Sequence, residues 1–269
     1  MNLDEEVKRL IKNHVDKLKF HNGKKFIEIN KFSPQQQREK DLQEIPKKLM
    51  RVKSVYLKIE ERIKELKTLI PDITEQTTLC AVYLIYGKVL QTWRAIFLLT
   101  ERGYNFEIME LNRSIVENLG LVHTFYLDKD LVHLSKWFQG EIITNGIARN
   151  LVDEYIAKNS VNTHGLSPYD MANYVYRGFS KYTHCSYAAL LESVDLFNED
   201  FDWNGYSGAH YSLKHIDALE STMTSTLITL KHTYLELKDM ESYVVINKIL
   251  LDFAGPMDDQ SLQELIAKT

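Results

Sequence analysis

The sequence predicts an all-α protein, a multi-helix bundle of long antiparallel helices with a helical extension at its amino-terminal end. Proline and glycine are scarce, with 5 Pro and 11 Gly among 269 residues, whereas a β-sandwich needs many turn residues. In most long segments apolar residues recur at steps of three and four, the period of a helix with one buried face. A chain of this length can bury a sizeable core. Helix packing is therefore the expected basis of the fold.

Residues 1–70 are predicted to form a basic extension that consists of a helix, an arm and a second helix. Residues 3–19 show a helical pattern with acidic residues in the first turn. Residues 20–40 carry Asn-Gly and Ser-Pro pairs and are expected to form a connecting arm. Residues 17–67 hold 15 Lys and Arg against 7 Asp and Glu, so they carry +8 and the remainder of the chain −12. This asymmetry can indicate attraction to nucleic acid or to an acidic partner, but a solvated helix face rich in Lys and Glu gives the same count and is the favoured interpretation.

A seam of apolar residues follows Pro46, a residue that suits the first turn of a helix. Its members recur at alternating steps of three and four over three heptads. They are Leu49, Val52, Tyr56, Ile59, Ile63, Leu66 and Ile70. The pattern fits one long helix packed along the bundle and fits equally a coiled-coil contact with a second subunit. A homodimer, or a protein partner bound through this helix, is thus an expectation.

Residues 71–269 are predicted to form the bundle core. A helix capped by Asp72 or Thr74 is expected to run to about Glu101, and its nearly all-round apolar character favours a central position. The next helix, over 105–127, follows so closely that the two should form an antiparallel hairpin. Further helices are expected over residues 129–138, 141–158, 168–198, 211–239, 241–253 and 258–268, with an aromatic and glycine-containing loop over 201–210.

Several classes of function have no signature in the sequence. There is no phosphate-binding Gly-x4-Gly-Lys, no dinucleotide Gly-rich turn and no His-Glu-x2-His, so neither a cofactor nor a metal is expected. His210 and His215 are five residues apart, a spacing that does not stack on one helix face. The most apolar run, residues 79–99, is interrupted by charged and polar residues, so no membrane span is expected. Cys80 and Cys185 lie in apolar helical patterns and are expected to be reduced core residues of a cytoplasmic protein.

Two short polar motifs interrupt these apolar patterns. In Arg113-Ser-Ile-Val-Glu117 the step of four places Arg113 and Glu117 on one helical stripe. In Tyr176-Arg177-Gly-Phe-Ser180-Lys-Tyr-Thr-His184 steps of three, four and seven place Arg177, Ser180 and His184 on another.

These residues fit more than one role. Arg177 and His184 would be separated by about 10.5 Å of helical rise, which suits the two ends of one extended ligand. With RNA as the ligand, Arg177 could pair with a phosphate while His184 takes or returns a proton as a ribose hydroxyl attacks. The same residues could instead form a satisfied buried network in which Arg177 pairs with Glu117. A third hypothesis is that Arg113, Glu117 and Arg177 hold a small polar ligand.

The run from Arg102 through Glu117, followed by the Tyr176–His184 motif, resembles a group of uncharacterised bacterial all-helical proteins with an Arg-Ser-x2-Glu helix and a Tyr-Arg-x-Leu-Ser-x3-His helix. This resemblance covers roughly residues 80–195. More distantly, Arg-x6-His on a late bundle helix resembles the HEPN superfamily, whose active members are metal-independent ribonucleases in toxin, antiphage and RNA-processing systems and usually act as dimers. The resemblance implies catalytic roles for Arg177 and His184.

The sequence therefore leads to two main hypotheses. The first is a HEPN-like metal-independent endoribonuclease, a toxin or a component of antiphage defence. Its catalytic residues would be Arg177 and His184, with Ser180, Arg113, Glu117 and Tyr176 in support, and RNA is its expected partner. The second is a non-catalytic helical module that serves interaction or dimerisation in a multi-protein bacterial system, through the apolar seam of residues 49–70.

Overall fold

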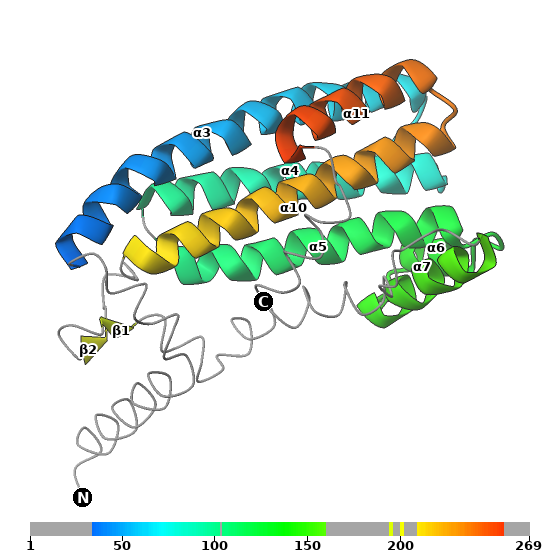
Figure 1. Ribbon diagram of the computed structural model, residues 1–269. Helices are drawn as coiled ribbons and strands as arrows, with labels where there is room; N and C mark the ends of the chain where they lie inside the picture. Colours follow the sequence, from blue (N-terminus) through cyan, green and yellow to red (C-terminus); the bar gives the residue numbers. More distant parts are fainter. Residues whose placement is uncertain (1–33, 103, 160–193, 196–199, 202–208, 256–269) are drawn as a thin grey trace, which may run out of the picture.

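A computed structural model describes residues 34–102, 104–159, 194–195, 200–201 and 209–255 of the chain (Figure 1). These residues form a helical bundle, which confirms the all-α prediction. The elements are α3 (Pro34–Leu66), the short 3-10 helix η1 (Lys67–Leu69), α4 (Thr78–Arg102), α5 (Asn105–Leu127), α6 (Val132–Phe138), α7 (Asn145–Asn159), β1 (Val194–Asp195), β2 (Asp200–Phe201), α10 (Ala209–Glu236) and α11 (Met240–Ala254). Predicted elements over residues 3–19, 168–193 and 258–268 lie outside the described residues.

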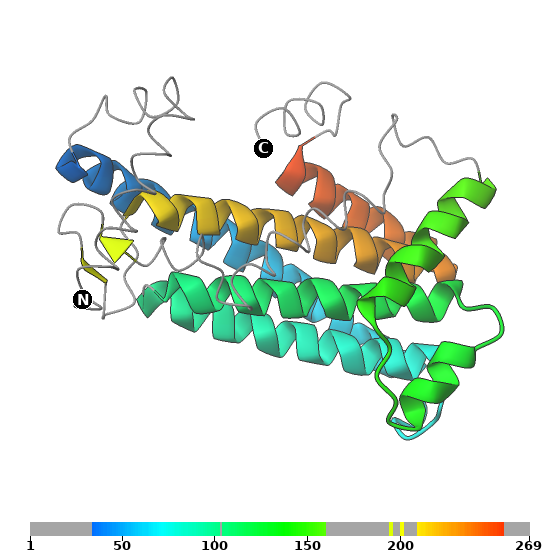
Figure 2. The ribbon, with the colours of Figure 1, turned by 90° about the horizontal axis from the view of Figure 1, so that it is seen from below.

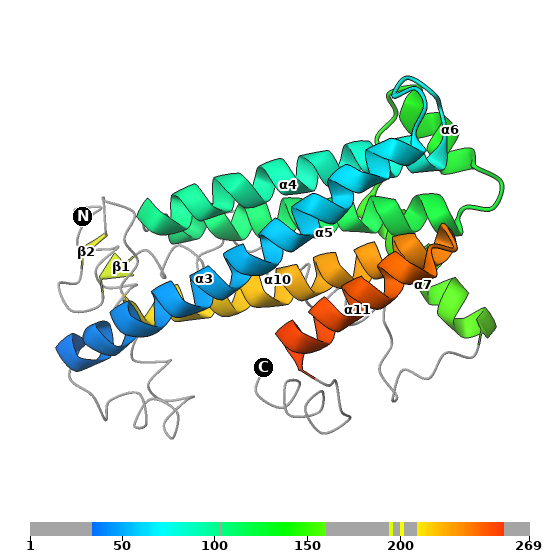
Figure 3. The same cartoon turned by 90° about the horizontal axis from the view of Figure 1, so that it is seen from above.

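Four long helices, α3, α4, α5 and α10, lie side by side and give the bundle its elongated shape (Figures 1 and 2). Helix α10 packs against α3, α5 and α11, while α4 packs against α5 and α3. Helices α3, α5 and α10 run in one direction and α4 and α11 in the other, as the view from above shows (Figure 3). One continuous core joins them, and its largest fully buried side chains include Trp93, Tyr86, Tyr234 and Phe125.

Helix α3 begins twelve residues before Pro46, which contradicts the predicted arm over residues 34–40 and the placement of Pro46 in a first turn. Pro34, and not Pro46, is the proline at the start of the helix. A proline inside a helix removes one backbone hydrogen bond and costs about 3 kcal/mol. The residues between the two prolines are mostly Gln, Glu, Lys, Arg and Leu, all strong helix formers, so the helix continues through Pro46.

The apolar seam on this helix packs inside the chain's own core. Its seven predicted members are all buried, and six of them, from Leu49 to Leu66, belong to the core shared with α4, α5, α10 and α11. Of the two interpretations of the seam, one long helix packed along the bundle is therefore the one that the structure adopts. In the described part of the expected extension, residues 49–66 share one core with the helices that follow.

Helix α4 begins later than predicted, and its cap is a different residue. Asp72 accepts hydrogen bonds from the backbone N–H and the hydroxyl of Thr74, at 2.9 and 2.8 Å, and so closes a turn instead of capping a helix. The hydroxyl of Thr77 accepts a hydrogen bond from the Cys80 N–H at 3.2 Å, which makes Thr77 the N-cap. Cys80 itself is buried as a free thiol, as predicted.

Helix α4 also has an exposed face, so its predicted central position is wrong. Leu84 and Leu98 are 43% and 66% exposed, and Lys88 and Gln91 share their stripe. Apolar residues are tolerated singly at the surface, and hydrophobicity alone therefore did not identify the central helix. That position belongs to α10, which carries several buried threonines among its apolar residues.

The remaining connections set the ends of the bundle. Helices α4 and α5 form the predicted antiparallel hairpin, and α5 spans the predicted residues 105–127. Helices α10 and α11 are separated at Lys238, which has a left-handed backbone with φ of 58°, and Asp239 caps α11 by accepting from the Ser242 N–H at 3.1 Å. Val194 and Asp195 pair with Phe201 and Asp200 as antiparallel strands, so the predicted helix does not extend to residue 198.

Candidate functional site

Arg113 and Glu117 lie on α5 as the sequence predicts, and they form an ion pair. The Arg113 Nε atom is 2.9 Å from Glu117 Oε1. The Arg113 side chain is only 14% exposed, whereas that of Glu117 is 40% exposed. The guanidinium therefore sits largely within the protein and its carboxylate partner reaches toward solvent. Such a pair holds a positive charge in place at the edge of the core.

The other predicted site residues, Tyr176, Arg177, Ser180 and His184, lie outside the described residues. The predicted binding of one extended ligand by Arg177 and His184 thus stays a prediction, as does any contact between them and the Arg113–Glu117 pair.

A cavity of about 200 Å³ lies beside Gly120 of α5, one helical turn from Glu117. Its walls come from three helices, α5, α7 and α10, and most of its surface is apolar. A Cβ atom at position 120 would stand 3.1 Å from Asn145 Oδ1 and 3.5 Å from the Ala148 Cβ. Glycine at this position therefore lets α7 approach α5 closely. The lining residues are Val116, Leu119, Gly120, His123, Asn145, Ala148, Arg149, Val152, Ser225 and Thr229.

His123, one of the residues that line this cavity, lies close to a second histidine. His123 on α5 and His232 on α10 have ring centroids 5.3 Å apart. The Thr229 hydroxyl donates to the Ser225 carbonyl, so it can only accept from His123 Nε2, which is 3.1 Å away. This fixes His123 in the tautomer that carries the proton on Nε2. On its other side His232 lies 3.2 Å from Glu236 Oε1.

Burial keeps both imidazoles neutral. Desolvation, together with the neighbouring His232, lowers the pKa of His123 to about 4. Desolvation also lowers the pKa of His232, although Glu236 partly opposes that shift. At neutral pH the pair is thus uncharged, and the positive charge that lines the cavity comes from Arg149.

A row of threonines runs along α10, and one of them, Thr229, also lines the cavity. Thr222, Thr226, Thr229 and Thr233 are buried, and each donates its hydroxyl proton to the carbonyl four residues earlier. The Tyr86 hydroxyl, fully buried on α4, bonds to the Thr233 oxygen at 2.8 Å. These threonines are spaced by four, three and four residues, which places them on one face of a helix. That spacing is visible in the sequence and could have identified this row.

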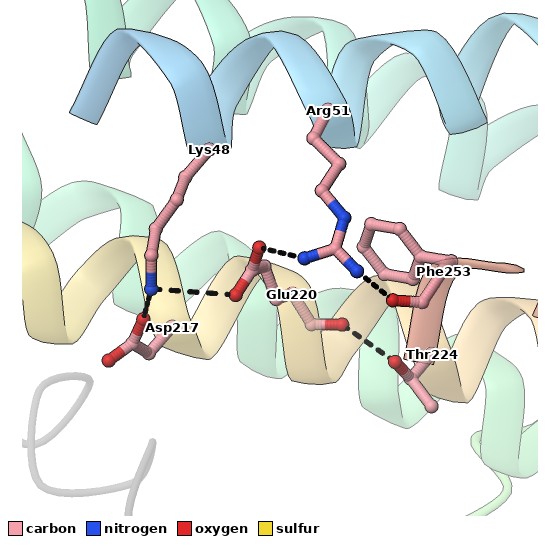
Figure 4. A network of polar contacts seen from close by, with 6 residues as sticks. All are labelled: Lys48, Arg51, Asp217, Glu220, Thr224 and Phe253. Carbon is pink, nitrogen blue, oxygen red and sulfur yellow. Dashed lines mark hydrogen bonds and ion pairs between the residues drawn. The ribbon is translucent and has the colours of Figure 1, made fainter. Parts of the chain in front are cut away.

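A second polar cluster ties α3 to α10 and α11 (Figure 4). Lys48 reaches Asp217 at 2.5 Å and Glu220 at 3.7 Å, and Arg51 Nη1 reaches Glu220 at 3.3 Å. Arg51 also donates to the Phe253 carbonyl and lies 4.8 Å from the centre of the Phe253 ring. Partial burial lowers the pKa of Lys48, but the hydrogen bonds and charges of Asp217 and Glu220 outweigh it, so the pKa is raised overall.

Many of the basic side chains of α3 therefore pair with carboxylates of the bundle. Three of its cations contact carboxylates on other helices, and three more contact carboxylates on α3 itself. Glu60 is shared between Lys64 of α3 and Arg94 of α4, at 2.7 and 2.5 Å, and its pKa is lowered by the Lys64 hydrogen bond above all. For this helix the contacts favour a paired, solvated face over a free surface for nucleic acid.

We expect Arg51→Met to lower the free energy of unfolding by about 1–2 kcal/mol, because it removes an ion pair and a hydrogen bond to a carbonyl. In a urea-unfolding cycle with Glu220→Gln, the coupling should be about 0.5 kcal/mol and should shrink in 1 M salt. Lys47→Met is the matched control, since Lys47 pairs with Glu44 through an exposed contact, and it should change stability little. A coupling energy that does not respond to salt would contradict this account of the cluster.

Two further kinds of site have no counterpart in the described residues. Among them no group of three or more His, Cys, Asp or Glu is arranged to hold a metal ion. His215, a residue of α10, is buried. Within the same part of the chain, no helix has both the length and the apolar character needed to cross a membrane.

The sequence reasoning identified Arg113 and Glu117 but missed the cavity beside them. Arg149, Asn145 and His123 belong to no motif, and they meet only because α7 folds back onto α5. Comparison with known proteins adds nothing further, since no family model, no curated protein and no solved structure matches this chain.

Proposed function

We propose that this protein is a metal-independent endoribonuclease resembling the HEPN superfamily, with Arg177 and His184 as its catalytic residues. The observation that carries the proposal is the spacing of Arg177 and His184 in the Tyr176–His184 motif. The all-α bundle is consistent with that resemblance, and the Arg113–Glu117 pair supplies a fixed polar group on α5. Arg113, Glu117, Ser180 and Tyr176 are proposed to support the site.

The proposed reaction needs only RNA and the protein. The ribose 2′-hydroxyl attacks the adjacent phosphorus, a bond forms between that oxygen and phosphorus, and the bond to the 5′ oxygen breaks. His184 takes the proton from the 2′-hydroxyl or returns one to the 5′ oxygen, and solvent carries the other proton. Arg177 pairs with a non-bridging phosphate oxygen. The products are a 2′,3′-cyclic phosphate and a 5′-hydroxyl.

The cellular setting is part of the same proposal. A cytoplasmic homodimer that places the two catalytic residues in a cleft between subunits would match the HEPN arrangement, and a toxin or antiphage role would follow from it. The second candidate is the non-catalytic interaction module. It is favoured by an exposed apolar stripe on α11, formed by Met240, Val244 and Leu251 at 53%, 61% and 49% exposure.

The test is cleavage of a labelled RNA by purified protein in the presence of a chelator. We expect cleavage to persist in EDTA and to leave 2′,3′-cyclic phosphate ends. His184→Ala and Arg177→Ala should each lower the rate at least about 100-fold, the scale of one acid–base group. The melting temperature should stay within a few degrees of the parent protein. His21→Ala, at a histidine outside both motifs, is the matched control and should cleave normally.

Three outcomes would count against the proposal. RNA left intact by the parent protein would favour the interaction module. Cleavage by His184→Ala at the parent rate would point to a different catalytic group or a contaminating nuclease. A large drop in melting temperature on His184→Ala would indicate that His184 belongs to a buried network.

A further inference from the structure

The cavity beside Gly120 is mostly apolar, and its volume suits a small molecule. Val116, Leu119, Ala148 and Val152 provide the apolar walls. An engineered apolar cavity of about 150 Å³ binds benzene, so a volume of about 200 Å³ accommodates one ring with a short substituent. The same volume lies below the range of about 300–1,000 Å³ that is typical of drug-sized ligands. A ligand of this cavity would therefore be smaller than a nucleotide.

Asn145 supplies a hydrogen-bond donor to the lining. It lies on α7, and its Nδ2 atom is buried without an acceptor among the described residues. A buried donor without an acceptor is destabilising, because it has lost its hydrogen bonds to water. An oxygen atom of a ligand would restore one of those hydrogen bonds.

Two other lining residues supply acceptors. The proton of His123 is on Nε2, which donates to the Thr229 oxygen, so Nδ1 carries a lone pair that can accept. The Ser225 hydroxyl donates its proton to the Ser221 carbonyl at 3.1 Å, so its oxygen is left as an acceptor. A hydroxyl group on the ligand suits this mixture, because it both donates and accepts, whereas a carbonyl or carboxylate oxygen only accepts.

The lining does not select a charged ligand. None of the described residues that line the cavity is a carboxylate, so an ammonium group would have no counter-ion there. Arg149 also lines the cavity, but it already takes part in another interaction, and His123 is neutral at pH 7. A charge without a partner is costly in an apolar site, and a neutral ligand avoids that cost.

We propose that this cavity binds a small neutral alcohol with an apolar body. The ligand oxygen accepts a hydrogen bond from Asn145 Nδ2, and its hydroxyl proton is donated to His123 Nδ1 or to the Ser225 oxygen. The apolar body lies against the walls of α5 and α7, beside Gly120. This proposal stands apart from the ribonuclease proposal, because none of its residues is among the predicted catalytic ones.

The test compares benzyl alcohol with ethylbenzene, which has a methyl group in place of the hydroxyl and nearly the same shape. Calorimetry on the full chain at pH 7 should show saturable binding of benzyl alcohol at millimolar concentration. Benzyl alcohol should bind at least as tightly as ethylbenzene, although leaving water is easier for the hydrocarbon. Benzoate and benzylamine, which are charged at this pH, should bind at least about 10-fold more weakly than benzyl alcohol, because their charges lose water without gaining a partner.

Two variants test the residues. Asn145→Leu keeps the size of the side chain and removes its amide, so it should weaken binding of benzyl alcohol at least about 5-fold and should not weaken binding of ethylbenzene. Gly120→Ala places a methyl group 3.1 Å from Asn145 Oδ1 and should weaken binding of both probes, because Asn145 has to shift. Gly87→Ala on α4 is the matched control and should bind normally, since a Cβ at that position meets nothing within 4 Å.

Circular dichroism separates loss of binding from loss of folding. Each variant should keep the helical spectrum of the parent, and Asn145→Leu carries the test if Gly120→Ala does not fold. Tighter binding of ethylbenzene or of benzoate than of benzyl alcohol would overturn the proposal. So would unchanged binding of benzyl alcohol by Asn145→Leu, an equal loss of both probes in that variant, or no saturable binding of benzyl alcohol at millimolar concentration. RNA cleavage is not a readout here, so the two proposals can fail separately.

Discussion

Replacing Ile59 by aspartate should unfold the bundle or leave it barely stable. Ile59 is 1% exposed in the core that joins α3 to the other long helices. Loss of the buried isoleucine alone costs about 2–5 kcal/mol, and a carboxylate forced into that position adds a further desolvation penalty. Small domains are stable by only about 5–15 kcal/mol, so the sum removes much or all of the stability. Urea unfolding followed by circular dichroism measures the loss.

Leu57→Asp is the matched control on the same helix, because Leu57 is 63% exposed. It should change the free energy of unfolding by less than about 0.5 kcal/mol. Light scattering on both variants tests the role of the seam. An Ile59→Asp protein that stays folded but changes its oligomeric state would show that the seam contacts a second subunit after all.

The second large effect is a loss of stability in mild acid that depends on His123. The pKa of this imidazole is about 4 in the folded protein, since burial and His232 disfavour its charge, and about 6.5 in the unfolded chain. Between these values the unfolded state binds the extra proton, so stability is complete above pH 6.5 and falls as pH falls toward 4. The full shift corresponds to about 3 kcal/mol.

Urea unfolding at pH 7, 5.5 and 4.5 measures this loss, and His123→Gln separates it from the titration of the carboxylates. Glutamine can place its amide N–H near Thr229 but cannot titrate, so the variant should lose less stability than the parent over the same pH range. If the two proteins lose stability in parallel as pH falls, His123 is not the group responsible. His232→Gln should also lose less stability than the parent as pH falls. The difference should be smaller than for His123→Gln, because Glu236 partly restores the pKa of His232.

The residues that the sequence predicted well are those governed by local rules. The 105–127 helix and its hairpin with α4 follow from apolar periodicity and a very short connection. The seam on α3 was assigned to the right residues, all of which are buried. The Arg113–Glu117 pair follows from a spacing of four on one helix, which fixes the contact wherever the helix packs.

The incorrect predictions arose where local signals compete. Pro46 is typical of a helix start, but the residues around it are strong helix formers, so α3 continues without a break at this proline. Asp72 and Thr74 are both capping residue types, but they close a turn, and Thr77 caps α4 instead. The apolar composition of α4 predicted a position at the centre of the bundle, but Leu84 and Leu98 are exposed. Helix α10, with its buried threonines, packs against three helices, α3, α5 and α11, whereas α4 packs against α5 and α3.

The amino-acid sequence is enough to predict that the chain forms long helices, which face of α3 is apolar, and that Arg113 meets Glu117, because these depend on residues within a few turns of one another. What covers each face becomes known only from the way the helices pack. The seam on α3 packs within the same chain, Lys48 and Arg51 pair with α10, and Arg149, Asn145 and His123 meet around one cavity. Periodicity states which side of a helix avoids water, but the partner on that side is set by how distant segments pack together.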